Sequence, residues 1–407
     1  MSEKLIIVGA GQAAAQAVQS LRAEGFVGPI TLIGDEAYGP YQRPPLSKAY
    51  LLGTFERERL FLKADAFYQE ADCTVMLNTR ALALHRAEKT VELSDGRRLA
   101  YDKLLLTTGT RVRKLTCPGA ELPGVHYLRD IADVDGLQAV FVAGKRIAIV
   151  GGGYIGLEVA AVSAKRGLDV IVFEAMDRLM ARAVSPPVSD FFAAEHEKAG
   201  VQLKLRTGVE AIEGDGKVAS KVKAVRAGGK SYDADIVLVG IGVVPNDELA
   251  ARAGLACEDG IVVDQTGMTG DPAIFAAGDC TRHIGREGTA IRLECVQNAI
   301  DQAQHCALAI VGRPKTYREV PWFWSDQFDL KLQIAGLARP ADRIVVRGDP
   351  ASRKFAVFHL RDGAVAAVEA VNAAPEYMVG KKLIADGVRI APGKLADLSI
   401  SMKQMAP

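Results

Sequence analysis

The chain has 407 residues, 49% of them hydrophobic and 24% charged, an ordinary composition for a globular protein of about two to three domains. Its 50 basic residues against 49 acidic ones produce no overall field, which excludes bulk attraction to nucleic acid or to an anionic membrane. The six cysteines form no CxxC pair and accompany no histidine cluster, so we expect neither a metal site nor a dithiol active site.

The first residues, "MSEKLIIVGAG", enter a strand pattern at once, without the basic and then apolar segments that direct export. Apolar runs such as "DADIVLVGIGVVPN" are shorter than the roughly 20 residues that a helix needs to cross a bilayer. We therefore expect a cytoplasmic protein with no membrane partner and no nucleic-acid partner.

The first predicted elements are a strand, a glycine turn and an alanine-rich helix in "KLIIVGAGQAAAQAVQSLRAEG". The turn is a GxGxxA in which Gly9 bends the chain, Gly11 lets the backbone approach a pyrophosphate, and Ala14 allows close packing. The N-terminus of the helix offers free N–H groups to phosphates. Asp35 and Glu36 end the next strand, where a ribose hydroxyl needs an acceptor. These elements predict a dinucleotide-binding unit.

The segment "GPYQRPPLSKAYL" follows this unit and combines prolines with Arg43 and Lys48, but it has no acid, cysteine or histidine. Its prolines are suited to a rigid helix entry. The first cysteine of the chain is Cys73, so the segment provides no thiol where a disulfide reductase would need one.

A second copy of the first unit begins at "KRIAIVGGGYIGLEVAAVSAKRG", with Gly151, Gly153 and Gly156 in a GxGxxG. Each copy continues with a strand that ends in an acid and closes with a strand after an aspartate, "YDKLLLTTG" in the first and "ADIVLVGIG" in the second. This shared order indicates a duplication and two dinucleotide-binding units. Glu174 accepts from a ribose 2′-hydroxyl and repels a 2′-phosphate, which favours NAD(H), although Arg178 and Arg182 follow it.

The rest of the chain completes the first unit and adds another domain. The strand pattern in "TGDPAIFAAGDCT" belongs to neither repeat and predicts a return to the first sheet, while alternating strands follow "PWFWSDQ". We expect an α/β protein with two Rossmann-like domains, one inserted in the other, and a C-terminal α+β domain. The predicted boundaries are 1–112 with 243–321 for the first, 113–242 for the second and 322–407 for the third.

The order of GxGxxA, "PYQRPPLSK", GxGxxG, "GxxPN" and "IFAAGD" resembles the FAD-dependent pyridine nucleotide reductases, of glutathione reductase-like fold, over nearly the whole chain. Within them, "RPPLSK" and "PWFWSDQF" resemble the oxygenase-coupled NADH:ferredoxin reductases of the putidaredoxin reductase type. This resemblance implies bound FAD, hydride transfer from NADH, and single-electron transfer to a [2Fe-2S] ferredoxin that serves an oxygenase such as a cytochrome P450.

The resemblance also implies the site residues. The FAD pyrophosphate would be bound by Gly9, Gly11, Gln12 and Ala13, and the remaining FAD contacts would be Asp35, Arg43, Lys48, Arg80, Ala81, Arg129, Asp279, Val296 and Trp322, with Trp324 as a neighbour. The NAD contacts would be Gly151, Gly153, Tyr154, Ile155, Glu158, Glu174, Arg182 and Gly242.

Lys48 and Glu158 are the predicted catalytic residues. As a pair at the point of hydride transfer they would stabilise negative charge on the reduced flavin and position the nicotinamide. The alternative is an interdomain salt bridge of little energetic consequence.

The predicted partner is a ferredoxin with an acidic surface. Residues 322–407 carry 12 Lys or Arg against 9 Asp or Glu, and the candidate docking residues are Arg313, Lys315, Lys381 and Lys382. Two alternatives are a reductase for a small molecule such as a quinone, and a redox-signalling flavoprotein resembling apoptosis-inducing factor.

Overall fold

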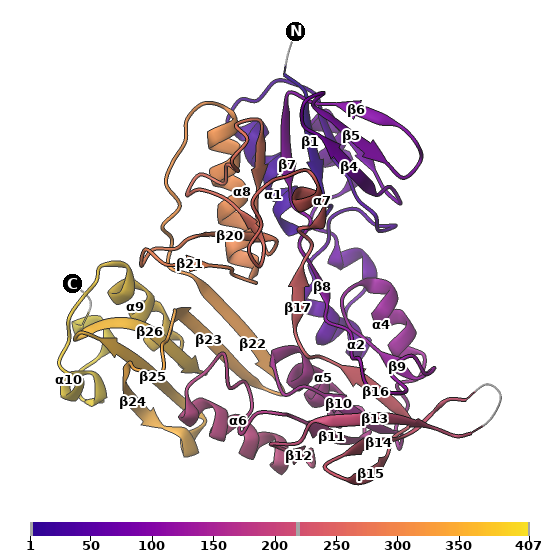
Figure 1. Ribbon diagram of the computed structural model, residues 1–407. Coiled ribbons are helices and arrows are strands. Elements are labelled where there is room, and N and C mark those ends of the chain that lie inside the picture. Colours follow the sequence, from indigo (N-terminus) through magenta and orange to yellow (C-terminus); the bar gives the residue numbers. More distant parts are fainter. Residues whose placement is uncertain (1–2, 217–219, 406–407) are drawn as a thin grey trace. The chain divides into compact units, whose positions relative to one another are not determined.

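The computed structural model describes residues 3–216 and 220–405, and the chain divides into two compact units (Figure 1). The first unit consists of Met1–Gln42, Arg57–Arg111 and Val243–Pro321. The second consists of Arg43–Glu56, Val112–Gly242 and Trp322–Pro407. The segments of the two units therefore alternate along the chain, and the second unit contains both the short segment with Lys48 and the C-terminal residues. The three-domain division into 1–112 with 243–321, 113–242 and 322–407 stays a prediction.

A five-stranded parallel sheet forms the centre of the first unit. Its order is β19-β7-β1-β2-β3, and short runs of Leu, Ile and Val form strands here because both faces are covered. Leu5 and Ile7 of β1 face helices α1 and α8, while Ile6 and Val8 pack on the opposite side with Leu84, which belongs to a small antiparallel sheet (Figure 1). The elements are β1 (Leu5–Val8), β2 (Ile30–Ile33), β3 (Cys73–Met76), β7 (Lys103–Leu106), β19 (Ile274–Ala276), α1 (Gln12–Ala23) and α8 (Val296–Ile310).

Smaller elements complete the first unit. They are η2 (Arg57–Leu60), α3 (Asp65–Glu70), the antiparallel sheet β4 (Ala81–His85), β5 (Thr90–Leu93) and β6 (Arg98–Ala100), helix α7 (Glu248–Arg252), and the sheet β18 (Ile261–Val262), β20 (Thr281–Ile284) and β21 (Ala290–Ile291). A two-stranded sheet pairs β8 (Thr110–Val112), whose last residue is counted with the second unit, with β17 (Val243–Pro245).

The second unit repeats the plan of the first sheet. Strand β10 pairs in parallel with β11 and β16, just as β1 pairs with β2 and β7, which confirms the predicted duplication. The sheet has the order β12-β11-β10-β16-β9. Its elements are β9 (Val125–His126), β10 (Arg146–Val150), α5 (Tyr154–Lys165), β11 (Asp169–Phe173), α6 (Pro186–Lys198), β12 (Gln202–Lys204) and β16 (Ile236–Val239), together with η1 (Pro44–Ser47), α2 (Ala49–Leu52), α4 (Ile131–Gln138), β13 (Val209–Gly214), β14 (Val222–Ala227) and β15 (Lys230–Asp233).

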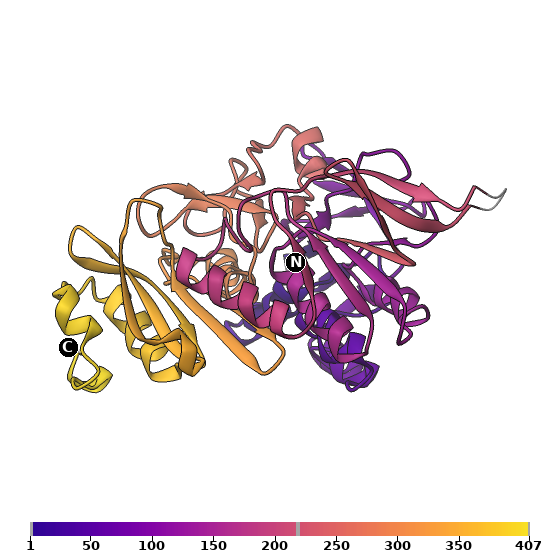
Figure 2. The same ribbon diagram turned by 90° about the horizontal axis from the view of Figure 1, so that it is seen from below.

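The C-terminal part of the second unit is an antiparallel sheet of order β22-β23-β26-β25-β24. On one face Leu330, Phe355 and Val357 pack against the apolar residues of α6, whose helix lies beside the β22–β23 hairpin in Figures 1 and 2. On the other face α9 approaches closely at Gly380, where a Cβ would lie 2.7 Å from Val368. The elements are β22 (Trp322–Gln327), β23 (Leu330–Gly336), β24 (Arg343–Asp349), η3 (Pro350–Ser352), β25 (Lys354–Arg361), β26 (Ala364–Val371), α9 (Ala374–Ala385), α10 (Pro392–Ala396) and η4 (Met402–Gln404).

Among the described helices, every one is too short or too polar to cross a bilayer.

Candidate functional site

The first glycine turn is shaped by steric limits on its backbone. Gly9 has a φ of +107°, and a Cβ there would lie 2.2 Å from the carbonyl oxygen of Thr107, the residue that follows the neighbouring strand β7, so only glycine fits. Gly11 is the N-cap residue of α1, and the space where its Cβ would stand is open to 4 Å. Because glycine supplies no capping oxygen, the first N–H groups of α1, at Gln12 and Ala13, suit the pyrophosphate of FAD.

The predicted adenosine-side residues lie beside this turn. A Cβ at Gly34 would be 2.6 Å from the Cβ of Ala10, so the end of β2 touches the glycine turn. The backbone N–H of Thr79 donates to the carbonyl oxygen of Gly34 over 2.9 Å. The first unit thus brings together the exposed acid and the segment that follows β3: Asp35, Arg80 and Ala81.

The loop that carries Asp279 is fixed by a buried glutamine. The Oε1 atom of Gln302 accepts from the backbone N–H of Gly278 and from the hydroxyl of Thr281, each over 2.8 Å. Gln302 was not identified from the sequence. Its spacing from Asn298 by one helical turn places two polar residues on the same side of α8, and both are buried, which could have indicated a role. The contact places Gln302 in a positioning role for the predicted ribityl acceptor.

Two helix N-termini flank the same loop. A Cβ at Gly278 would lie 3.4 Å from Ala13 of α1 and 3.6 Å from Ala299 of α8. Val296 is the first residue of α8, so the predicted isoalloxazine neighbour and Asp279 come from adjacent segments of the first unit. The glycine cradle, the helix dipoles and the carboxylates together fit a dinucleotide such as FAD.

Cys295 precedes Val296, and its thiol is unsuited to nucleophilic chemistry. Burial raises the pKa of Cys295 to about 12, so the thiol stays protonated at neutral pH. Burial likewise raises the pKa of Cys73 to about 11. This agrees with the expectation that the chain works without a reactive thiol.

His283 gives the first unit a specific pH dependence. It is 3% exposed, its Nδ1 atom accepts from Gln302 over 3.1 Å, and burial lowers its pKa to about 4. In the unfolded chain the ring takes up a proton near pH 6.5. The contribution of the neutral His283 ring to the free energy of unfolding is therefore fully present above pH 6.5, and it falls by about 3 kcal/mol at most as the pH drops towards 4. We expect His283→Asn, which keeps an acceptor, to make the thermal midpoint less sensitive to acid. If the thermal midpoint fell equally in the wild-type protein and in the variant between pH 7 and pH 5, this prediction would be wrong.

The second glycine turn repeats the steric constraints of the first. Gly151 has a φ of +109°, and a Cβ there would lie 2.4 Å from the carbonyl oxygen of Gly240. Gly153 is the N-cap of α5, with open space at its Cβ position, while a Cβ at Gly156 would meet the carbonyl oxygen of Gly151 at 2.1 Å. This geometry fits a second dinucleotide at the N-terminus of α5.

Glu174 ends β11 beside this turn. Its carboxylate accepts from the backbone N–H of Gly152 over 2.7 Å and from that of Met176 over 2.8 Å, one bond to each oxygen. Arg178 donates to the carbonyl oxygens of Ala181 and Val184, each over 2.7 Å, so its guanidinium is bound within its own loop. Glu174 is therefore fixed beside the second glycine turn, where a ribose contact is predicted, while the guanidinium of Arg178 is bound elsewhere.

Four other predicted NAD residues lie around this region. Ile155 leaves 44% of its surface exposed at the start of α5, and Arg182 is exposed on the loop after β11. Gly242 follows β16 with a φ of +95° and open space around its Cβ position. Tyr154 is half-buried, and its ring lies 4.5 Å from that of Phe323.

Lys48 and Glu158 form an ion pair within the second unit. The Nζ atom of Lys48 lies 2.7 Å from Oε2 of Glu158, with the two side chains 19% and 2% exposed. Lys48 also donates to the carbonyl oxygen of Pro44 over 3.2 Å, and the hydroxyl of Ser47 donates to the same carboxylate oxygen. Ser325 donates to the other oxygen over 2.6 Å. The carboxylate is thus held by donors on both oxygens, from parts of the chain far apart in sequence.

The other FAD residues predicted in the second unit are also found together in pairs. Arg43 donates to the carbonyl oxygen of Arg129 over 2.7 Å. The rings of Trp322 and Trp324 lie 5.7 Å apart on one face of β22, with the ammonium of Lys381 5.3 Å from the Trp322 ring. Contacts of these residues and of Lys48 with the flavin stay predictions. Among the proposed docking cations, Arg313 is paired with Glu24 at 2.7 Å.

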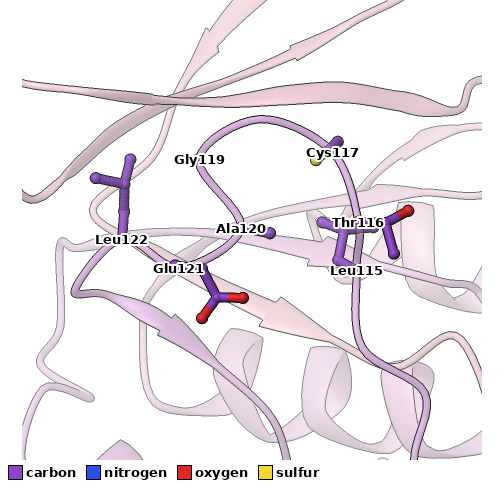
Figure 3. A pocket seen from close by; sticks show the side chains of 7 residues that line it. All are labelled: Leu115, Thr116, Cys117, Gly119, Ala120, Glu121 and Leu122. Atoms are coloured by element: carbon purple, nitrogen blue, oxygen red, sulfur yellow. The ribbon is translucent and has the colours of Figure 1, made fainter.

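A small hollow on the loop before β9 lies apart from these residues. It is lined by Leu115, Thr116, Cys117, Gly119, Ala120, Glu121 and Leu122 (Figure 3). None of the predicted cofactor or catalytic residues lines it, so we assign it no part in the chemistry.

Comparison with known proteins gives consistent results over the whole chain. Residues 3–305 match the family described as pyridine nucleotide-disulphide oxidoreductase, and residues 322–406 match the reductase C-terminal family. A probable ferredoxin reductase of Castellaniella defragrans is 44% identical and covers 100% of this chain and 99% of its own. Rhodocoxin reductase of Rhodococcus erythropolis is 44% identical over 98% of this chain and 93% of its own. The crystal structure of a covalent putidaredoxin reductase–putidaredoxin complex matches with a TM-score of 0.96 and 38% identity, over 99% of this chain and 98% of that one.

Proposed function

Because the chain belongs to the pyridine nucleotide-disulphide oxidoreductase family and carries its reductase C-terminal domain, we propose that it is an NADH-dependent ferredoxin reductase. Bound FAD would supply the conversion of one hydride from NADH into two single-electron transfers to a [2Fe-2S] ferredoxin. The ferredoxin would in turn serve an oxygenase such as a cytochrome P450. Relatives named as ferredoxin reductases, similar over nearly their full length, support this acceptor.

One structural observation carries the proposal. The segment that follows the first glycine turn, Pro44–Lys48, presents an ammonium bound to a buried carboxylate and contains no thiol. A lysine–carboxylate pair can stabilise negative charge and orient a polar group, but it cannot form a mixed disulfide. This favours transfer of electrons to an external acceptor over reduction of a disulfide.

Different residues of the chain would bind the two dinucleotides and assist the transfer of hydride between them. The turn at Gly9 and Gly11 would bind the FAD pyrophosphate, with Asp279 as acceptor for the ribityl chain. The turn at Gly151 and Gly153 would bind NADH. The Lys48–Glu158 pair would stabilise the charge that the flavin gains and orient the nicotinamide. We also propose a cytoplasmic location, in keeping with the free state of all six cysteines.

The proposal is tested by NADH-driven reduction of cytochrome c with and without a [2Fe-2S] ferredoxin. We expect rapid reduction only when the ferredoxin is present. If cytochrome c were reduced at the same rate with and without the ferredoxin, and a quinone were reduced rapidly, the protein would instead be a small-molecule reductase. A reduced complex with NAD that persists in air, with no turnover, would identify a signalling flavoprotein.

Replacement of Glu174 is expected to weaken the preference for NADH. Glu174→Gln removes the charge that repels a 2′-phosphate but keeps an acceptor for the N–H of Gly152, whereas Glu174→Ala removes both. We expect kcat/KM for NADH to fall about tenfold in the Gln variant, as expected for loss of about 1.4 kcal/mol, while the value for NADPH stays or rises. The Ala variant should lose activity with both nucleotides. An unchanged NADH to NADPH ratio in the Gln variant would show that Glu174 does not read the ribose.

A further inference from the structure

A chain of buried polar side chains runs from Glu158 to His196 inside the second unit. Ser325 donates to Oε1 of Glu158 over 2.6 Å, and Nε2 of Gln327 donates to the hydroxyl of Ser325 over 3.2 Å. The Oε1 atom of Gln327 lies 2.8 Å from Nε2 of His196. Ser325, Gln327 and His196 are each 0% exposed, so water cannot replace these bonds.

The hydrogen bonds that connect His196 with Glu158 all run in one direction. Because an amide oxygen can only accept, Nε2 of His196 must carry the proton that it shares with Gln327. Burial lowers the pKa of His196, in keeping with a neutral ring. Gln327 then donates to Ser325, and Ser325 to Glu158. Each donor therefore points towards the carboxylate that also binds Lys48.

Side chains of strand β22 alternate between its two faces, which explains how this series of hydrogen bonds reaches Glu158. Phe323, Ser325 and Gln327 lie on one face of the strand, and Trp322 and Trp324 lie on the other. The first face packs against α5 through Phe323, and its hairpin neighbour Leu330 belongs to the apolar core around α6. A serine and a glutamine on such a face cost free energy unless they are bonded, so their full pairing indicates a specific task.

We propose that Ser325, supported by Gln327 and His196, is a positioning residue that holds Glu158, and through it Lys48, in the orientation needed for hydride transfer. This inference rests on the proposed function. Ser47 and Lys48 bond one oxygen of the carboxylate, and Ser325 bonds the other, so Ser325 fixes the rotation of the carboxylate about its own axis. Without Ser325 the Glu158–Lys48 pair would persist but would no longer have one orientation.

The test is rapid-mixing reduction of the FAD-loaded protein by NADH, with no ferredoxin present. Ser325→Ala is expected to lower the limiting reduction rate about tenfold while the apparent Kd for NADH stays within about twofold, since the lost bond orients the pair. Ser163→Ala is the matched control, because Ser163 is also 0% exposed and lies on the same helix as Glu158 but donates to the carbonyl oxygen of Val159. The control is expected to reduce at the wild-type rate.

A double-mutant cycle separates positioning from general loosening of the fold. If Ser325 acts through Glu158, then Ser325→Ala should have no further effect on the rate in a Glu158→Ala background. The inference would be overturned if the effects of Ser325→Ala and Glu158→Ala on the reduction rate multiplied in the double variant, or if Ser325→Ala were reduced at the wild-type rate. Should Ser325→Ala fail to fold, Gln327→Met tests the next link, and an unchanged rate there would equally overturn it. Wild-type protein that NADH does not reduce would refute the proposed function itself, so the two failures are distinguishable.

Discussion

Lys48→Ala is expected to slow reduction of the bound flavin by NADH about a hundredfold, which corresponds to the roughly 3 kcal/mol that one well-placed charged donor contributes to a transition state. The wild-type ammonium lies 2.7 Å from a carboxylate that is 2% exposed. Its removal takes away the positive charge proposed to stabilise the reduced flavin and leaves Glu158 with a smaller set of donors. The limiting rate at saturating NADH, followed by the flavin absorbance after rapid mixing, measures this effect.

Lys198→Ala provides the comparison for this variant. Lys198 also pairs with a glutamate, Glu195, but the contact is 3.9 Å and the lysine is 75% exposed, so its removal should leave the rate unchanged. If Lys48→Ala also reduced at the wild-type rate, the pair would be an ordinary ion pair that supports the fold of the second unit. Retention of FAD by both variants shows that the rates refer to folded, loaded protein.

Gly9→Ala is expected to give a protein that does not retain FAD. The new Cβ would lie 2.2 Å from the carbonyl oxygen of Thr107 at a φ of +107°. Gly9 and Thr107 directly follow the paired strands β1 and β7, so they cannot move apart without disturbing the sheet. We expect a cost of about 4 kcal/mol or more, which is a large part of the stability of a typical domain. The yield of yellow protein and the FAD-to-protein ratio after gel filtration measure the effect.

Two other glycines make this prediction specific. Gly11→Ala meets nothing within 4 Å, so it should fold and should lose FAD affinity only through the space that the pyrophosphate needs. Gly270→Ala also meets nothing within 4 Å and lies on the exposed surface of the same unit, so it should bind FAD normally. Normal FAD content in Gly9→Ala would mean that the first glycine turn is not the constraint described above.

The parts of the fold that could be predicted from the sequence are those set by local backbone requirements. Gly9 and Gly151 occupy the same position in two copies of one strand–turn–helix pattern, and each is required by the carbonyl oxygen of the residue that follows the adjacent strand. Such a requirement leaves a repeated signal in the sequence. The pairing of Lys48 with Glu158 was expected only through resemblance to a family, because no spacing rule joins residues so far apart.

The supporting residues could not be predicted in this way. Ser325 reaches Glu158 across 167 positions of the sequence, and a single serine in a strand of mixed aromatic and polar residues gives no periodic signal. The association of residues 322–407 with the second unit was also hidden, since it depends on the apolar side of α6 meeting the face of a sheet. Pattern and propensity describe one element at a time, whereas these contacts depend on how elements pack.

The discontinuous make-up of the two units has a consequence for the order in which the protein folds during synthesis. The edge strand β19 of the first sheet is Ile274–Ala276, and strand β22, which supplies Ser325, is Trp322–Gln327. A nascent chain that has already made Lys48 and Glu158 must therefore wait for β22 before the carboxylate receives its last donor. The first sheet lacks its edge strand until residue 276 is made, and the Glu158 carboxylate lacks its last donor until β22 follows. An unpaired strand edge of this kind is a feature that chaperones recognise.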